Sequence, residues 1–485
     1  TWLLIINLLT FILSCLFSIG LLIVEILYFY DILFENNFVL YVSSVILNLP
    51  EKNPLLWSNI KFIFILSTFL ANIIILNFLL ESLFSKFSYE NKCFEKVTFA
   101  DKLNLIIGQD FSLKEKVIIP EKGLFQNILI TGAIGSGKTS SAMYPITEQL
   151  IAYNSNSSSN RLGMLILDVK GNYYNQVLEF AKKHNRLDDL ISIQVAGKYK
   201  YNPLDNTSLK PSVLANRLKT ILLLFSPNNT ESYWIDKSET ALSEAIKLCR
   251  LYNNNYVTFS ELHNLITNRD YYFSKISFLR KKFLSNSFSK SEIHDLLSTI
   301  NFFEKEFFSL DDRTLNILKS EITRITNCFI SDSDVFSTFC PSKSEINFNG
   351  FSDVINSGKI VVLNMNINEY RNLSKIIATY LKLDFQTEVL KQLSNNSSSS
   401  LKPVAFISDE YSEYVSATDA NFFSQSRESK CINVVSTQSY TSLLNALNNK
   451  YSVEVIVQNL VNKLWFRSDD MFTIEDAQKQ LRKSR

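Results

Sequence analysis

The clearest chemistry in this sequence lies in residues 132–139, which read Gly-Ala-Ile-Gly-Ser-Gly-Lys-Thr. Their order and spacing match the phosphate-binding loop G-x-x-x-x-G-K-[ST] in full. Glycines let the backbone wrap around phosphate groups, and consecutive amides at the start of a helix supply positive potential. Three of the 11 glycines in the chain fall within this loop, so an ordinary glycine-rich turn is a poor alternative.

This loop predicts a nucleotide site in which each residue type has a role. Lys138 is expected to reach the β- and γ-phosphates and to act in hydrolysis, and Thr139 is expected to bind Mg²⁺. The expected nucleotide is ATP, held by Gly132, Ala133, Ile134, Gly135, Ser136, Gly137, Lys138, Thr139 and Ser140.

A phosphate loop also needs an acidic residue at the end of a neighbouring strand, and two candidates follow apolar runs. Asp409 and Glu410 follow residues 404–408, and Asp168 follows residues 164–167. Adjacent carboxylates can divide two roles, so we expect Asp409 to bind magnesium and Glu410 to polarise the attacking water. A solvated acidic loop is the alternative for this pair. The segment with Asp168 and Lys170 either contacts nucleotide, acts as a switch, or forms a plain strand-to-helix turn with Asp168 as the N-cap.

Two further polar residues are candidates for catalysis. Gln438 follows the apolar run 432–437 and is expected to sense the γ-phosphate or to hold the water, unless it is simply a loop residue. Arg427 lies between Glu410 and Gln438 and is a candidate arginine finger for a neighbouring subunit, although most arginines lie on solvated faces.

The segments that must position these residues have the pattern of an α/β fold with a mostly parallel sheet. Short apolar runs alternate with helix-length segments, and the expected buried strands are 127–131, 164–168, 191–195, 360–363, 404–408, 432–436 and 463–466. Between 211 and about 334 such runs vanish, and segments with helical spacing appear, such as 234–251 and 315–325. We therefore expect an all-α insertion within the α/β domain.

Two uncharged apolar runs, residues 3–24 and 62–80, precede the α/β pattern. Each approaches the about 20 residues that cross a bilayer, so we expect transmembrane helices at about 3–27 and 61–83. Lysines follow the second run, whereas residues 31–59 carry three acids and one lysine. Lysine excess marks the cytoplasmic side, which predicts a multi-pass protein of the cell membrane with its ATPase domain in the cytoplasm. Two buried helices of a soluble domain are the alternative.

Composition narrows the classes of protein less than the motifs do. The net charge of +2 from 49 basic and 47 acidic side chains neither favours nor excludes nucleic-acid binding, because local patches matter more than totals. The six cysteines are scattered without a CxxC pair. This spacing argues against a zinc site or a disulfide framework and indicates a reducing compartment.

Taken together, these motifs resemble the type IV secretion coupling protein family, the TraG/TraD-type ATPases of conjugative DNA transfer. The resemblance covers nearly the whole chain. Residues 167–171 are similar to the family's D-P-K-G segment, with Val169 in place of proline, and residues 201–205 match its N-P-L-D element. Residues 406–410 resemble the Walker B strand, with Ser408 interrupting the apolar run. Residues 426–428 and 435–439 resemble the arginine-finger segment and the glutamine motif.

This resemblance implies a RecA-like core, assembled as a homo-hexamer around a central channel. It implies ATP-driven pumping of single-stranded DNA, or of a DNA–relaxase complex, into a channel built by other secretion subunits. Catalysis would rest on Lys138, Thr139, Asp409, Glu410, Gln438 and Arg427. The implied domains are a membrane anchor (1–85), the first part of the nucleotide-binding domain (86–210), the all-α insertion (211–345), which would recognise DNA and substrates, and the second part of the nucleotide-binding domain (346–485).

Two other functions stay open at this point. A docking receptor would bind nucleotide to recruit secreted proteins with little turnover, and it would not need Glu410. A DNA translocase of the FtsK kind shares the anchor and the core, but that family usually has four spans and a separate DNA-reading module. An ABC transporter is disfavoured, because no LSGGQ-like segment occurs in the sequence.

Overall fold

A computed structural model describes residues 103–482 apart from 111, 158–159, 169–170, 226–231, 285–287 and 396–400, together with Leu55 and Asn59. The chain forms two compact units, Thr1–Thr98 and Phe99–Arg485, and nearly all of the described residues belong to the second. Both expected membrane helices, 3–27 and 61–83, lie outside the described residues. Within the described part of the chain, no helix combines the length and the apolar character needed to span a bilayer.

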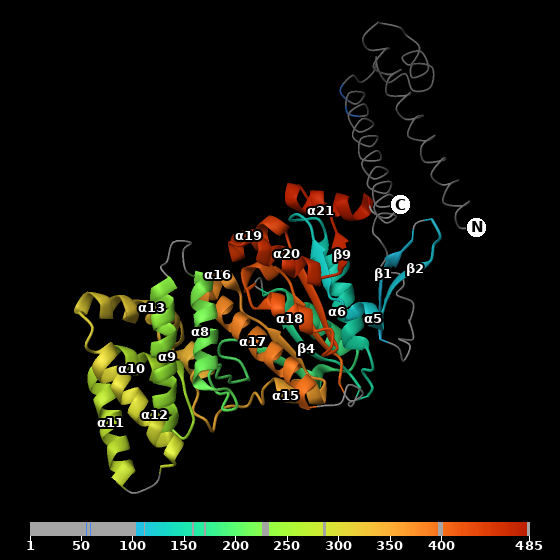
Figure 1. Cartoon of the computed structure of the whole chain (residues 1–485). Helices are drawn as coiled ribbons and strands as arrows, with labels where there is room; N and C mark the ends of the chain where they lie inside the picture. The colour runs from blue at the N-terminus through green and yellow to red at the C-terminus, as the bar shows by residue number, and fades with distance from the viewer. Residues whose placement is uncertain are drawn as a thin grey trace, which may run out of the picture. The chain divides into compact units, whose positions relative to one another are not determined.

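The second unit is built on a parallel sheet, in which seven strands are described (Figure 1). Their spatial order is β5 (Leu190–Ile193), β6 (Ile360–Leu363), β4 (Gly163–Leu167), β7 (Val404–Ser408), β8 (Cys431–Thr437), β3 (Ile128–Thr131) and β9 (Asn462–Trp465). Every residue of β3, β4, β6, β7 and β8 is buried. Parallel strands covered on both faces read as continuous apolar runs, and this is why these five strands were predictable from the sequence. The expected strands β5 and β9 are also found, although both are partly exposed.

Each face of the sheet has its own hydrophobic core, because successive side chains of a strand point to opposite faces. Ile128 and Ile130 of β3 pack into one core, while Leu129 packs into the other. The first core is covered by α5 (Glu121–Leu124), α6 (Tyr144–Ala152) and α7 (Tyr173–Lys183). The second is covered by α15 (Phe351–Ser357), α17 (Asn372–Asn395), α18 (Asp419–Gln425), α19 (Tyr440–Leu447) and α20 (Lys450–Asn459).

The connection from β5 to β6 consists of helices and loops in its described residues. Ahead of α15, these helices are α8 (Pro211–Phe225), α9 (Ser232–Tyr252), α10 (Phe259–Thr267), α11 (Arg269–Leu284), α12 (Lys290–Asn301), the π-helix η3 (Phe302–Phe307), α13 (Asp312–Ile330) and α14 (Ser333–Phe339). Side-chain caps begin several of them, such as the capping box of Ser289 and Glu292. Aromatic rings fill the interior, where Phe259 stacks on Phe329 with ring centroids 3.8 Å apart.

Helix α17 joins this helical insertion to the sheet. Figure 1 shows it running beside α8, and it also contacts α13 and β4. Outside these layers lie an antiparallel hairpin of β1 (Asn104–Gln109) and β2 (Lys116–Pro120), the short helices η2 (Leu187–Asp189) and α16 (Ile367–Tyr370), and α21 (Met471–Arg482).

Candidate nucleotide-binding and hydrolysis site

Four strands bring predicted site residues to the same side of the sheet, where the carboxyl ends of the strands lie. The register pairs Thr131 of β3 with Thr437 of β8, and Leu167 of β4 with Ser408 of β7. Ser408 in turn pairs with Val435 of β8, so the carboxyl ends of these strands lie within two residues of one another. The phosphate loop follows β3, and Gln438 follows β8. Asp409 follows β7, and Asp168 follows β4. In an open α/β sheet, ligands bind outside the carboxyl ends of the strands.

Glycine is required at the start of the phosphate loop because the end of β9 lies against it. A Cβ atom on Gly132 would lie 2.5 Å from Cβ of Phe466 and 2.7 Å from Oγ of Ser136. The amide of Ala133 donates to the carbonyl of Arg467 at 2.7 Å, which ties the loop to the chain that follows β9. Gly137 has a φ of 89°, a conformation that other residues rarely adopt.

Lys138 folds back over its own loop. Its Nζ donates to the carbonyl of Gly132 at 2.6 Å and lies 3.4 Å from that of Ala133, and the residue is 6% exposed. The π-helix η1 (Thr139–Met143) begins directly after it and continues into α6. The ammonium group and the first amides of a helix therefore lie in one short segment, which is the combination of groups that binds phosphate.

Thr139 and Asp409 contact each other although β8 lies between the strands that precede them, β3 and β7. Oγ1 of Thr139 lies 3.0 Å from Oδ2 of Asp409, while Oδ1 of Asp409 accepts from Oγ of Ser436 on the intervening strand β8 and from the amide of Glu410. A hydroxyl and a carboxylate oxygen are ligands that suit Mg²⁺, which takes one or two protein carboxylates together with phosphate oxygens. The described residues contain no group of three His, Cys, Asp or Glu side chains that would form a metal site without phosphates.

Glu410 is held in a left-handed backbone conformation, with a φ of 49°. For a residue other than glycine, this conformation costs about 1–3 kcal/mol, so the surrounding contacts must impose it. Nε2 of Gln438 donates to Oε2 of Glu410 at 3.3 Å. The two residues expected to handle the attacking water therefore contact each other.

A buried tyrosine supports the turn that contains Glu410. The hydroxyl of Tyr414 lies 2.7 Å from the carbonyl of Asp409 and 3.2 Å from that of Leu167, and it accepts from Oγ of Ser408 at 3.0 Å. Burial raises the pKa of Tyr414 well above its ordinary value, so the hydroxyl stays a neutral donor. Ser408, which interrupts the apolar strand in the sequence, is thus the partner of this tyrosine.

The other predicted residues have different surroundings. Oδ2 of Asp168 accepts from the amide of Tyr173 at 3.1 Å, so this carboxylate binds the first turn of α7 as a capping residue does. Val169 and Lys170 lie outside the described residues. Arg427 is exposed and precedes β8, at the amino end of the strands, and it is therefore not brought together with Lys138 in its own chain.

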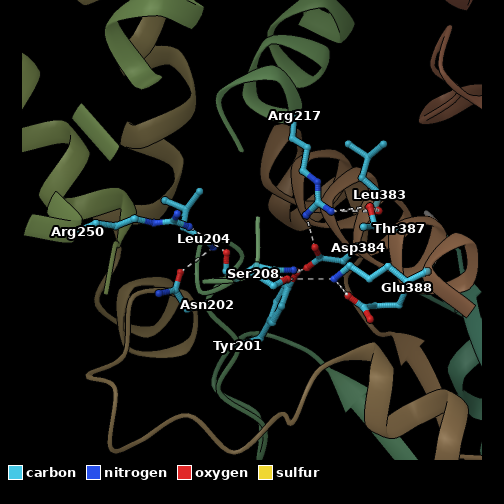
Figure 2. Close-up of polar contacts among 12 residues, drawn as sticks. Tyr201, Asn202, Leu204, Ser208, Arg217, Arg250, Leu383, Asp384, Thr387 and Glu388 are labelled. Carbon is cyan, nitrogen blue, oxygen red and sulfur yellow. Dashed lines mark hydrogen bonds and ion pairs between the residues drawn. The ribbon is translucent and has the colours of Figure 1, made fainter. Parts of the chain in front are cut away.

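The element at residues 201–205 lies away from this site, at the junction between the insertion and α17. Figure 2 shows Tyr201 and Arg217 directed toward Asp384 of α17. Nδ2 of Asn202 donates to the carbonyl of Val257 at 2.8 Å, which fixes the entrance to the insertion. A cavity of about 380 Å³ lies here, lined in part by Tyr201, Asp205 and Asp384.

Ser436, Tyr414 and Ser408 are site residues that sequence reasoning did not assign. Ser408 carried a weak signal, since it is the polar residue at the carboxyl end of an otherwise apolar strand, whereas Ser436 lies in a strand that also contains Asn433 and Thr437. Tyr414 carried none, because its contacts with Leu167 and Asp409 depend on the packed turn.

Comparison with known proteins gives a likeness of structure. No protein-family model matches the chain, and neither does any curated protein sequence. The plasmid coupling protein TrwB bound to a non-hydrolysable GTP analogue aligns at 13% identity with a TM-score of 0.50, covering 75% of this chain and 76% of that one. TrwB with ADP and Mg²⁺ aligns at 13% identity with a TM-score of 0.49, over 77% of this chain and 78% of that one. VirB4 of Thermoanaerobacter pseudethanolicus aligns at 14% identity with a TM-score of 0.47, over 78% of this chain and 88% of that one.

The TrwB alignment extends over three quarters of each chain. At 13% identity, this alignment supports a shared fold and does not establish the chemistry of individual residues. The chain therefore shares the fold of the coupling protein TrwB over the aligned three quarters of its length.

Proposed function

We propose that this chain is a membrane-anchored ATPase that moves single-stranded DNA, alone or bound to a relaxase, into a type IV secretion channel. One observation carries the proposal: Thr139, Asp409, Glu410 and Gln438 converge at the sheet edge where the loop of Lys138 lies. The fold shared with TrwB, which binds a nucleoside triphosphate analogue in a solved structure, supports it.

The site residues divide the work of phosphoryl transfer to water. Lys138 and the loop amides bind the phosphates of ATP, and Thr139 and Asp409 would hold Mg²⁺, which neutralises phosphate charge. Glu410 orients the attacking water and accepts its proton. The amide of Gln438 holds the Glu410 carboxylate and is close enough to take part in placing the same water.

The proposal extends to the assembly and the membrane. Arg427 is exposed at the edge of the sheet opposite Lys138, so it can serve as an arginine finger only toward the nucleotide of a neighbouring chain. We therefore propose a homo-hexamer, anchored by residues 1–85, with the α/β domain divided into 86–210 and 346–485 by the insertion 211–345. The anchor places the ATPase domain on the cytoplasmic face, beside other subunits of the secretion channel.

The test is ATP hydrolysis by the detergent-solubilised chain, with and without single-stranded DNA. We expect DNA to stimulate turnover, and Lys138→Ala to abolish it. Lys182→Ala, at an exposed lysine that pairs with Glu179, is the matched control and should keep the wild-type rate. Normal hydrolysis by the Lys138→Ala variant would show that the site is elsewhere.

A second variant separates a motor from a docking receptor. Glu410→Gln keeps the size of the side chain and removes the carboxylate that accepts the proton, so a motor should lose turnover while it still binds ATP. A basal rate equal to that of the wild type would instead favour the receptor.

A further inference from the structure

A second buried polar cluster lies behind the hydrolytic carboxylates, around the ion pair between Lys382 of α17 and Asp419 of α18. Nζ of Lys382 lies 2.6 Å from Oδ2 of Asp419, and both side chains are fully buried at 0% exposure. The ammonium also donates to the carbonyl of Tyr414 at 2.7 Å and to Oγ of Ser416 at 3.0 Å. Its three protons therefore have three acceptors.

The carboxylate of Asp419 is equally well satisfied. Besides Lys382, it accepts from Nε2 of Gln386 at 3.0 Å, from the hydroxyl of Tyr411 at 2.5 Å and from the amide of Ser416 at 3.0 Å. A buried ion pair gains little stability over apolar side chains of similar size, because desolvation offsets the attraction. A fully connected network does, however, select one geometry.

That geometry is the path of the chain just after Glu410. Tyr411, the next residue, is bound through its hydroxyl to Asp419, and Tyr414 is bound through its carbonyl to Lys382. The hydroxyl of Tyr414 in turn contacts the carbonyl of Asp409. The left-handed Glu410 thus lies between Asp409, whose carbonyl contacts Tyr414, and Tyr411, whose side chain binds Asp419.

We propose that Lys382 and Asp419 are positioning residues that hold Glu410 in its left-handed conformation, with its carboxylate beside Gln438. Neither residue touches the phosphate loop; they act through Tyr411 and Tyr414. This inference rests on the proposed function, because it assigns a purpose to the position of the Glu410 carboxylate.

The test compares Asp419→Asn with a control at another buried pair. Asp189 pairs with Arg186, whose side chain is 0% exposed, and these residues lie before β5, away from Glu410. Both Asp→Asn variants should lower the melting temperature. Asp419→Asn should also lower kcat for ATP about tenfold or more, since small displacements of catalytic groups are costly. The Kd for ATP should stay within about twofold, because Lys138 and Thr139 are not displaced.

Two additional measurements make the result decisive. Tyr411→Phe removes one hydroxyl from the cluster and should also lower kcat. This variant takes the place of Asp419→Asn if Asp419→Asn does not fold. Hydrogen exchange of residues 409–416 should speed up in both cluster variants and not in Asp189→Asn.

The inference would be overturned if the cluster variants lost stability, as the control does, while their kcat and their hydrogen exchange stayed unchanged. If the wild type shows no turnover, the proposed function fails, and the exchange of residues 409–416 still decides whether the pair holds this segment.

Discussion

Oγ1 of Thr139 lies 3.0 Å from Oδ2 of Asp409, although 270 residues separate them in the chain. The contact crosses β8, which lies between the strands that carry the two residues. Ser436 of β8 donates to Oδ1 of Asp409. This contact orients the carboxylate so that its other oxygen, Oδ2, faces Thr139. Two oxygen atoms from distant segments are thereby placed where a single Mg²⁺ can bind both.

Asp409→Asn should weaken magnesium binding, because an amide is a poorer ligand for a hard cation than a carboxylate. We expect the Mg²⁺ concentration for half-maximal ATP hydrolysis to rise by at least the roughly tenfold typical of losing a supporting partner of a metal site. A magnesium titration of turnover measures this. Asp353→Asn, at a partly exposed pair with Lys359, is the control. An unchanged magnesium requirement would exclude Asp409 as a ligand.

Gly132→Ala should distort the phosphate loop. The added methyl group would lie 2.5 Å from Cβ of Phe466 and 3.3 Å from the carbonyl of Arg467, neither of which is the end of a flexible side chain. Overpacking of this kind costs about 1–3 kcal/mol, and we expect ADP affinity measured by calorimetry to fall by about tenfold or more. Gly108→Ala is the matched control, since no atom lies within 4 Å of its Cβ position. Equal ADP affinity in the two variants would contradict the tight contact.

The strands and the phosphate loop were predictable because their signals are local. A fully buried parallel strand reads as an apolar run, and Val404–Ser408 and Ile360–Leu363 have the expected bounds. The order of the strands was not predictable, because the placement of β8 between β3 and β7 depends on contacts between distant segments.

The supports of the site were harder to predict than the site itself. Lys382 lies between Leu381 and Leu383 in α17, which signals a buried partner without naming it. Asp419 follows 37 residues later, in a segment of ordinary polarity. Arg427 lies at the amino end of the strands, so the role proposed for it depends on a second chain and has no local signal in the sequence.

His263 of α10 should make the stability of the insertion depend on pH. Burial lowers its pKa below the usual 6.5, and Nδ1 lies 3.0 Å from Oγ1 of Thr326. The unfolded chain therefore takes up the proton first, so the stability is complete above the ordinary pKa and decreases as the pH falls through the folded value. Urea unfolding at pH 7.5 and 5.5 measures the loss. His263→Gln should reduce it, whereas substitution of the exposed His294 should not. Equal losses in the two variants would contradict this assignment.

Arg217 and Asp384 should couple the stability of the insertion to that of the sheet domain. Asp384 follows Lys382 by two residues, about 200° around α17, and pairs with Arg217 of α8 (Figure 2). Helix α17 thus takes part in two ion pairs: Lys382 pairs with Asp419 of α18, and Asp384 pairs with Arg217 of the insertion. Because Arg217 is only 6% exposed, Asp384→Leu would leave a buried charge without its partner and cost about 3–5 kcal/mol.

The double variant Arg217→Met/Asp384→Leu removes both charges and should recover most of that loss. Urea unfolding of the two single variants and the double variant gives the coupling energy. Lys200 and Glu345 form a more exposed pair near the same junction, and Lys200→Met should cost at most about 1 kcal/mol. If the losses at Arg217 and Asp384 simply add, the two residues do not act as a pair. A strong coupling would instead show that this ion pair holds the insertion to α17, the helix whose other face carries Lys382.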